Sequence, residues 1–426
     1  MIFRKLFGSR WPKDIPRLYP LLDGPELCDF LGPQEYERIK QLQMVMVCPF
    51  YSEAHSESGK LDSLFGAGLS RLLIRDLMLI KNISVRGPED TAHMPMEFME
   101  KVSKSESKTN TIFVTGECRV TDGFRFDYAI WQQGERTAEG TIRDSDLHKF
   151  LHACAETIGK AVGGDITAEL DEPWSLARPK DEQSLARLGL LYLVYRREEG
   201  PKPNEIVTKA LVDDPNFALL HTQFKDNASL TGHLKALELD PFDAQNCFSL
   251  FISTWKSNGE YEPEAVQFLR KAIKLSPGHG KAHMCAPHAA HPDRQAKMIR
   301  HSELGYRLLP GNPFAINNYI LNLQRAKAPA DQIIPLAKEG IANDPSDPGN
   351  YQRMIEICVG SKEYKTALIV AEELQKLYEP EMDERALYCL KQNPKAAQMI
   401  ESGEWDPAAE NRKLIEDLKK RAETDA

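Results

Sequence analysis

The stretch Leu237-Glu-Leu-Asp-Pro241 belongs to a pattern that returns at regular intervals through the second half of the chain: a small or helix-favouring stretch, then an acidic or polar residue, then proline. The further copies end at Pro277, Pro310, Pro345 and Pro380, and these prolines are separated by 36, 33, 35 and 35 residues. An earlier copy ends at Pro215, which is 26 residues before Pro241. A period near 34 residues predicts a series of helix–turn–helix units, because a proline cannot continue a helix and so ends each unit.

Small and apolar residues keep fixed places relative to these prolines. The position five before the proline holds Ala210, Ala236, Ala272, Gly305 and Gly340, and earlier small residues stand at Ala265 and Ala367. Apolar residues spaced three and four apart mark the first helix of two units, namely Ile316, Tyr319, Ile320 and Leu323, and Cys247, Leu250, Phe251 and Thr254. Residues 182–380 thereby resemble the tetratricopeptide repeat. The 26-residue unit is too short for two full helices, so we expect one clipped helix there.

The resemblance implies an all-α solenoid, a curved array with the first helix of each pair on its concave side. Such arrays present surfaces for partners more often than they catalyse reactions. In this frame the residues expected to face the concave side are Phe248, Trp255, Asn317, Gln324, Gln352 and Glu356. An alternative for Phe248 and Trp255 is that they pack between repeats, as aromatic residues at helical spacing usually do.

The first half reads as an α/β domain with the order βαβαβββα. Strands are predicted over residues 44–51, 83–85, 112–120, 124–130 and 137–142, and helices over 69–80, 95–102 and 147–158. Asp122-Gly123 is a hairpin signal between two alternating runs, and a turn containing Gly134 follows the second. Ser145 is the expected N-cap of the last helix. Pro33 could open a helix nearer the start of the chain.

Three stretches of this domain carry a resemblance to the TolB amino-terminal-like domain, which is often fused to tetratricopeptide repeats in bacterial regulators. They are Pro49-Phe50 after the first strand, Phe65-Gly-Ala-Gly-Leu-Ser-Arg-Leu-Leu-Ile74 and Val114-Thr-Gly-Glu-Cys-Arg-Val120. Members of that family typically carry a DNA-binding or nucleotide-cyclase domain upstream. Only about 40 residues precede the domain here, so we expect neither output domain, and the resemblance implies a regulatory protein without it.

Composition excludes several classes of function. The net charge of −9 argues against a nucleic-acid partner, which requires a basic face. No apolar run reaches the roughly 18 residues that a membrane-spanning helix needs. The first eleven residues could form a short amphipathic surface anchor, or a leader that packs on the next domain. Eight cysteines without a Cys-x-x-Cys pair predict reduced, buried thiols and a cytoplasmic protein.

No motif for catalysis is found: the chain has no phosphate-binding loop and no Gly-x-Ser-x-Gly elbow. One cluster of possible metal ligands comprises His279, His283, Cys285, His288 and His291. Zinc is conceivable there, but Pro287 is expected to break the helix and separate the ligands. We therefore expect no metal, no cofactor and no enzymatic activity, and a packing or solvated histidine patch instead.

These observations predict five segments: a partly helical leader at 1–43, the α/β domain at 44–165, a linker at 166–181, the repeats at 182–380 and capping helices with a polar tail at 381–426. The first functional hypothesis is a scaffold that binds a protein or peptide on the concave face of the repeats. The second is a sensory module, in which the α/β domain binds a small ligand and the repeats relay the signal. The sequence leaves the partner and the oligomeric state open.

Overall fold

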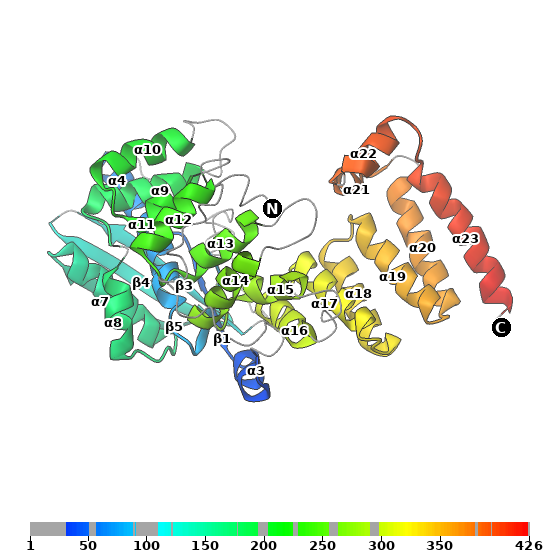
Figure 1. Cartoon of the computed structure of the whole chain (residues 1–426), viewed down its shortest axis with the longest axis horizontal. Helices are drawn as coiled ribbons and strands as arrows, with labels where there is room; N and C mark the ends of the chain where they lie inside the picture. The colour runs from blue at the N-terminus through cyan, green and yellow to red at the C-terminus, as the bar shows by residue number, and fades with distance from the viewer. Residues whose placement is uncertain are drawn as a thin grey trace. The chain divides into compact units, whose positions relative to one another are not determined.

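The computed structural model describes residues 31–50, 57–87, 90, 110–120, 122–176, 178–194, 203–224, 229–254, 263–289, 298–379, 382–392 and 394–424. The chain divides into two compact units, Met1–His283 and Met284–Ala426. A small mixed sheet lies in the first unit, and the described chain after the sheet is largely helical (Figure 1). Among the described helices, none has both the length and the apolar content that crossing a membrane requires.

Five strands form one sheet in the order β2-β1-β3-β4-β5. They are β1 (Gln43–Val47), β2 (Ile83–Val85), β3 (Thr111–Arg119), β4 (Phe124–Gln132) and β5 (Glu135–Asp144). β1 is parallel to β2 and β3, whereas β3, β4 and β5 form an antiparallel meander. The hairpin turns are tight because Asp122-Gly123 and Gln133-Gly134 all adopt positive φ angles, which confirms both predicted turns.

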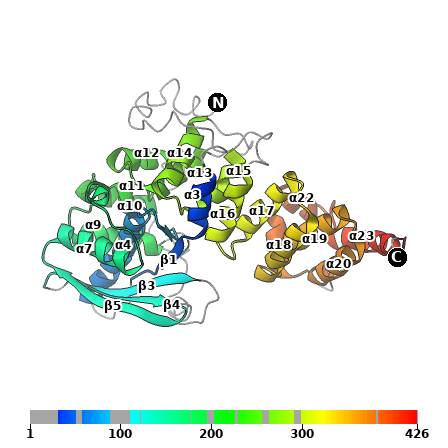
Figure 2. The same cartoon turned by 90° about the horizontal axis from the view of Figure 1, so that it is seen from below.

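Helices α4 (Glu57–Leu77) and α7 (Leu147–Ala161) pack on one face of the sheet (Figure 2). Their apolar stripes meet alternate strand residues, so that Val114, Phe126 and Phe150 are fully buried. Five strands and two helices lie where they were predicted, although β1 ends at Val47 and residues 48–50 of the strand predicted over 44–51 are not in a strand. The predicted helix over 95–102 lies outside the described residues. The N-cap of α7 is Asp146, which accepts a hydrogen bond from the Lys149 backbone N–H, and not the expected Ser145.

The segment 166–181, which we expected to be a linker, is packed structure instead. It forms the short helices η1 (Ala168–Leu170) and α8 (Asp171–Ser175). Trp174 is completely buried, and its Nε1–H donates to the Asp76 carbonyl at 3.0 Å. Polar composition and two prolines suggested an exposed linker. The buried Trp174 inside this polar stretch instead packs the segment against the core. The division between compact units falls at 283–284.

Helix α9 (Glu182–Val194) completes this packing by crossing α4 at very short range. A Cβ atom on Gly189 would lie 1.9 Å from the Leu64 carbonyl oxygen, and one on Gly68 would lie 2.0 Å from that of Leu185. Only glycine allows two backbones to approach this closely. The first helix of the predicted array is therefore part of the core of the α/β region.

Helical pairs continue through both units. In the first unit the helix α3 (Pro33–Lys40) precedes the sheet, and the helices of the pairs are α10 (Pro203–Asp213), α11 (Ala218–His221), α12 (Ser229–Leu239), α13 (Ala244–Thr254), α14 (Pro263–Leu275) and the start of α15 (Gly280–Ala289). Pro33 opens α3 as predicted. The four-residue α11 is the clipped helix expected in the 26-residue unit.

The second unit contains α16 (Ile299–Leu308), α17 (Pro313–Arg325), α18 (Ala330–Asn343), α19 (Pro348–Gly360), α20 (Tyr364–Tyr378), α21 (Glu384–Lys391), α22 (Pro394–Glu401) and α23 (Pro407–Thr424). Helices α16 to α20 pack on one another in chain order, and α23 lies against α20 (Figure 1). The predicted apolar stripe on α17 is confirmed, since Ile316, Ile320 and Leu323 are buried. Leu418 of α23 is also buried, so this helix covers α20.

Each repeated proline from Pro215 to Pro345 stands between two helices, and the residues after it fix the turn, while Pro380 lies outside the described residues. The side chain two positions later accepts a backbone N–H at the start of the next helix in Asp243, His279, Asn312 and Asp347. The side chain six positions after the proline is hydrogen-bonded to the proline carbonyl in three turns. These side chains are His221, His283 and Tyr351, at 2.8, 2.8 and 2.9 Å. These two contacts give the period a local physical basis, because they close the turn and cap the helix.

Candidate functional site

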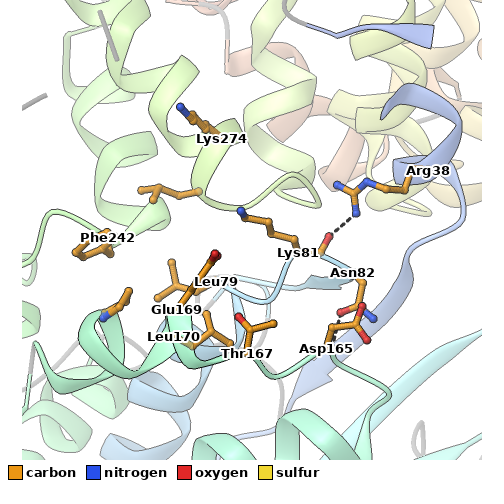
Figure 3. A pocket seen from close by; sticks show the side chains of 12 residues that line it. Arg38, Leu79, Lys81, Asn82, Asp165, Thr167, Glu169, Leu170, Phe242 and Lys274 are labelled. Carbon is orange, nitrogen blue, oxygen red and sulfur yellow. Dashed lines mark hydrogen bonds between the residues drawn. The ribbon is translucent and has the colours of Figure 1, made fainter. Parts of the chain in front are cut away.

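A cleft in the first unit, with a volume of about 520 Å³, is a candidate functional site formed by described residues. Five parts of the chain line it: α3, the segment between α4 and β2, the segment 165–173, the turn at Phe242, and the helix end at Lys274–Leu275 (Figure 3). It lies at the amino end of β2, whereas ligands in open α/β sheets usually bind beyond the carboxyl ends of strands. The site is therefore built by the helical additions to the sheet and not by the sheet edge itself.

The floor of the cleft is apolar. Leu79, Leu170 and Pro173 are buried beneath it, and Phe242 and Leu275 are half-buried at its side. Apolar walls with a few polar groups are typical of sites for small molecules, and volumes of about 300–1,000 Å³ are usual. The cleft is large enough to hold such a ligand.

The rim of the cleft carries charges of both signs. The exposed side chains of Lys81 and Lys274 lie on one side, and the exposed Asp165 and Glu169 lie on the other (Figure 3). Neither lysine forms an ion pair with any residue that the structure describes. Both ammonium groups are therefore available to a ligand.

Hydrogen bonds hold the backbone of the rim in place. The Arg38 guanidinium donates to the Lys81 carbonyl at 2.8 Å and is itself fixed by two hydrogen bonds to Glu35, at 2.6 and 2.7 Å. The contact with Arg38 lowers the pKa of Glu35, and the reciprocal contact raises the pKa of Arg38. Asn82 bridges two segments, because its amide donates to the Gly163 carbonyl and accepts the Asp165 N–H. Arg38 is thus already neutralised, which leaves two lysines and two carboxylates as the charges of the rim.

A buried network of charges connects the apolar side of the cleft to the core. Arg75 on α4 makes two hydrogen bonds to the carboxylate of Asp240, at 2.8 and 2.6 Å, and a third to Asp76 at 2.8 Å. Asp76 also pairs with Arg178 at 2.8 Å. Asp240 in turn accepts the backbone N–H of Phe242 at 3.1 Å, so the network positions an aromatic wall of the cleft.

The pKa values in this network depend on burial and on pairing. Burial opposes the charge on Arg75, but the carboxylates of Asp240 and Asp76 outweigh it and raise its pKa. Burial raises the pKa of Asp243, although the nearby Arg71 opposes that shift. Burial lowers the pKa of Lys271 on α14 to about 8. Lys271 and Asp243 are enclosed by packing and do not line the cleft.

The structure assigns turn-forming roles to two members of the histidine cluster. The Nδ1 atom of His279 caps α15, and the ring packs 5.1 Å from that of Phe248. The Nε2 atom of His283 contacts the Pro277 carbonyl. We expected Pro287 to break the helix, but it lies inside α15, which continues through it to Ala289. Within the described residues, no three histidine, cysteine or acidic side chains are placed to share a metal ion; His291 lies outside those residues.

The residues predicted to face a partner occupy different environments. Gln352 and Glu356 are exposed on α19, and Asn317 and Gln324 are half-exposed on α17. Phe248 is buried against His279, and Trp255 lies outside the described residues. Sequence reasoning missed both the cleft and the Arg75–Asp240 pair, because their residues come from segments with no shared motif. The aspartates before the repeated prolines were a signal that could have drawn attention to Asp240.

No protein-family model matches this chain, and no curated protein sequence is significantly similar to it. A functional assignment therefore has to come from the geometry of its own residues.

Proposed function

We propose that this chain is a non-catalytic, cytoplasmic interaction protein. It holds a protein or peptide partner on the first helices of its C-terminal hairpins, in the manner of a tetratricopeptide-type solenoid. The single feature that supports the proposal is the repeated hairpin with its proline turn. Exposed and half-exposed polar side chains lie on the first helices of successive hairpins and form a polar row.

The polar row comprises Asn317 and Gln324 on α17, Gln352 and Glu356 on α19, and Arg385 and Tyr388 on α21. Helices α19 and α21 pack together. Tyr388 is 55% exposed, and the Arg385 guanidinium lies 5.2 Å from its ring centroid. Tyrosine and arginine are the residue types that most often dominate binding energy at interfaces. They extend the row beyond the residues that the sequence pattern predicted.

The buried titratable groups also favour binding over catalysis. Catalytic acids and bases usually combine a shifted pKa with a place in a cleft. Three of the fully buried groups with shifted pKa values, His279, His283 and Asp243, serve helix caps and turns. No histidine, cysteine or serine is among the residues that line the cleft.

The experiment is partner capture from the native host with the full chain as bait. The test variant combines Gln352→Ala, Glu356→Ala and Tyr388→Ala, which remove side chains from one surface without opening the core. The control variant combines Lys338→Ala and Lys365→Ala, which lie exposed on the second helices α18 and α20. All three proteins are checked by circular dichroism and thermal unfolding.

The expected result is a partner that the wild type and the control retain and that the test variant loses by about tenfold or more. Equal capture by a folded test variant would place the interaction on another surface. Capture of no partner by any of the three proteins would contradict the proposed function.

A further inference from the structure

We propose that the cleft in the first unit binds a small zwitterion with an apolar body, a free amino acid or a short peptide with apolar side chains. The ligand would place its carboxylate between Lys81 and Lys274 and its ammonium group toward Asp165 and Glu169. This binding activity is separate from the partner surface of the C-terminal hairpins.

The sign pattern of the rim selects this class of ligand. A simple anion that reached the two lysines would be repelled by the carboxylates across the cleft. A simple cation that reached the carboxylates would be repelled by the lysines. A ligand with both charges can satisfy both sides, and its net charge of zero matches the rim once Arg38 is paired with Glu35. Charge-assisted hydrogen bonds of this kind are roughly twice as strong as those between neutral groups.

The floor and the volume specify the rest of the ligand. Leu79, Leu170 and Phe242 offer apolar surface between the charged sides, which a hydrocarbon or aromatic side chain would cover. A volume of about 520 Å³ exceeds what a single small amino acid fills, so peptides of two or three residues use the space better. Among zwitterions, apolar peptides are therefore expected to bind more tightly than amino acids.

The walls are held in place before any ligand arrives. Asn82 fixes Asp165 through the hydrogen bond to its N–H, Arg38 fixes the Lys81 carbonyl, and Asp240 fixes the Phe242 N–H. A preformed site loses less conformational freedom on binding, which favours affinity. Only the flexible ends of the lysines and carboxylates need to adjust.

The test is isothermal titration calorimetry of the full chain with the dipeptide Phe-Leu. Three matched probes separate the parts of the ligand: N-acetyl-Phe-Leu lacks the ammonium charge, Phe-Leu-amide lacks the carboxylate, and Gly-Gly lacks the apolar side chains. Free phenylalanine tests whether a single amino acid binds as tightly as the dipeptide. Phe-Leu is expected to bind, and each of the three probes to bind about tenfold or more weakly.

Two variants test the assignment to the cleft. Lys274→Glu and Glu169→Gln change exposed side chains on opposite sides of the rim, and each is expected to weaken Phe-Leu binding by about tenfold or more. Glu169→Gln is further expected to leave N-acetyl-Phe-Leu unaffected, since that probe has no ammonium group for Glu169 to bind. Lys149→Glu, exposed on α7 and outside the cleft, is the control and is expected to bind like the wild type.

Absence of heat with Phe-Leu at millimolar concentration would overturn the proposal. Equal binding of the blocked and free peptides would overturn it too, as would full affinity in both rim variants. The readout is independent of partner capture, so failure of this site and failure of the partner surface can be told apart.

Discussion

Buried charges decide much of the structure of the first unit at the scale of single residues. Arg75 has no exposed side-chain surface, yet it meets two carboxylates with good hydrogen-bond geometry. Removing one partner of such a pair leaves a charge without compensation in a medium of low polarity, which costs about 3–5 kcal/mol. Replacing the whole pair by apolar residues can cost far less, since no charge is then desolvated.

The first prediction concerns this pair. Asp240→Ala should lower the free energy of unfolding by about 3 kcal/mol or more, because Arg75 keeps only Asp76 and Phe242 loses its backbone acceptor. The double variant Arg75→Met with Asp240→Leu should lose less than the single variant. Urea denaturation monitored by tryptophan fluorescence measures both, with buried Trp174 among the reporters. A double variant that is less stable than Asp240→Ala would contradict the coupling.

The second prediction is an acid sensitivity. Burial lowers the pKa of His279 to about 3 and that of His283 to about 4. In the unfolded chain both would titrate near pH ~6.5. The unfolded state therefore binds more protons than the folded state below about pH 6.5. The stabilisation is complete above that pH and falls by about 1.4 kcal/mol per pH unit for each histidine toward pH ~4.

His279→Asn isolates one half of this effect. Asparagine can still accept the helix-capping N–H, as Asn312 does two residues after Pro310, but it does not titrate. The difference in unfolding free energy between variant and wild type should shift in favour of the variant by about 1.4 kcal/mol per pH unit between about pH 6.5 and 4. Urea titrations at three pH values measure it. Parallel pH profiles would show that His279 is not held neutral.

At the scale of whole helices, two glycines that looked equivalent in the sequence differ in their surroundings. A Cβ on Gly305 would lie 2.7 Å from the Met284 Cα, so α16 touches the backbone of α15. A Cβ on Gly340 would meet its nearest neighbour, Asn350 Oδ1, at 3.5 Å, which is ordinary contact. Gly305 is thus a close helix crossing, while Gly340 leaves room for a methyl group.

The third prediction rests on this contrast. Gly305→Ala should lower the stability by about 1–3 kcal/mol, since backbone atoms have to move apart. Gly340→Ala should raise it by about 0.5–1 kcal/mol, because alanine is the better helix former and has space. Thermal unfolding of the two variants beside the wild type measures both signs. Equal effects at the two positions would contradict the difference in packing.

Helices and strands could be predicted where the sequence carries a local signal. The turn residues Asp122-Gly123 predicted the hairpin, and apolar residues spaced three and four apart predicted the buried face of α17. The N-cap of α7 could not be fixed, because Ser145 and Asp146 are both good caps and the backbone selects one. The pairing of Arg75 with Asp240 spans 165 residues and leaves no local pattern. The cleft combines five such distant segments, so its residues gave no signal as a group.

At the scale of the molecule, the α/β region and the first helical pairs form one folded body. Asp240 and Asp243 come from the turn between α12 and α13, yet they meet Arg75 and Arg71 of α4. Gly68 and Gly189 bring α4 and α9 into backbone contact. Helix α4, which lies on the sheet, is therefore itself covered by α9, a helix that the repeat pattern had assigned to a separate array.

The fourth prediction is that a fragment ending at Ser175 does not fold. It lacks α9, which covers α4, and it leaves Arg75 without Asp240 and Asp76 without Arg178. A fragment ending at Ala289, the last residue of α15, keeps all of these contacts. Circular dichroism and thermal unfolding should show a cooperative transition for the longer fragment and none for the shorter.

Limited proteolysis of the full chain provides the control for this prediction, because it requires no truncation. Cleavage between 166 and 176 should be slow, since Trp174 and Leu170 hold that segment against the core. Rapid cleavage there, together with a cooperatively folding fragment ending at Ser175, would restore the linker that the sequence suggested. Slow cleavage would mean that the first unit unfolds as a whole before the protease reaches the segment.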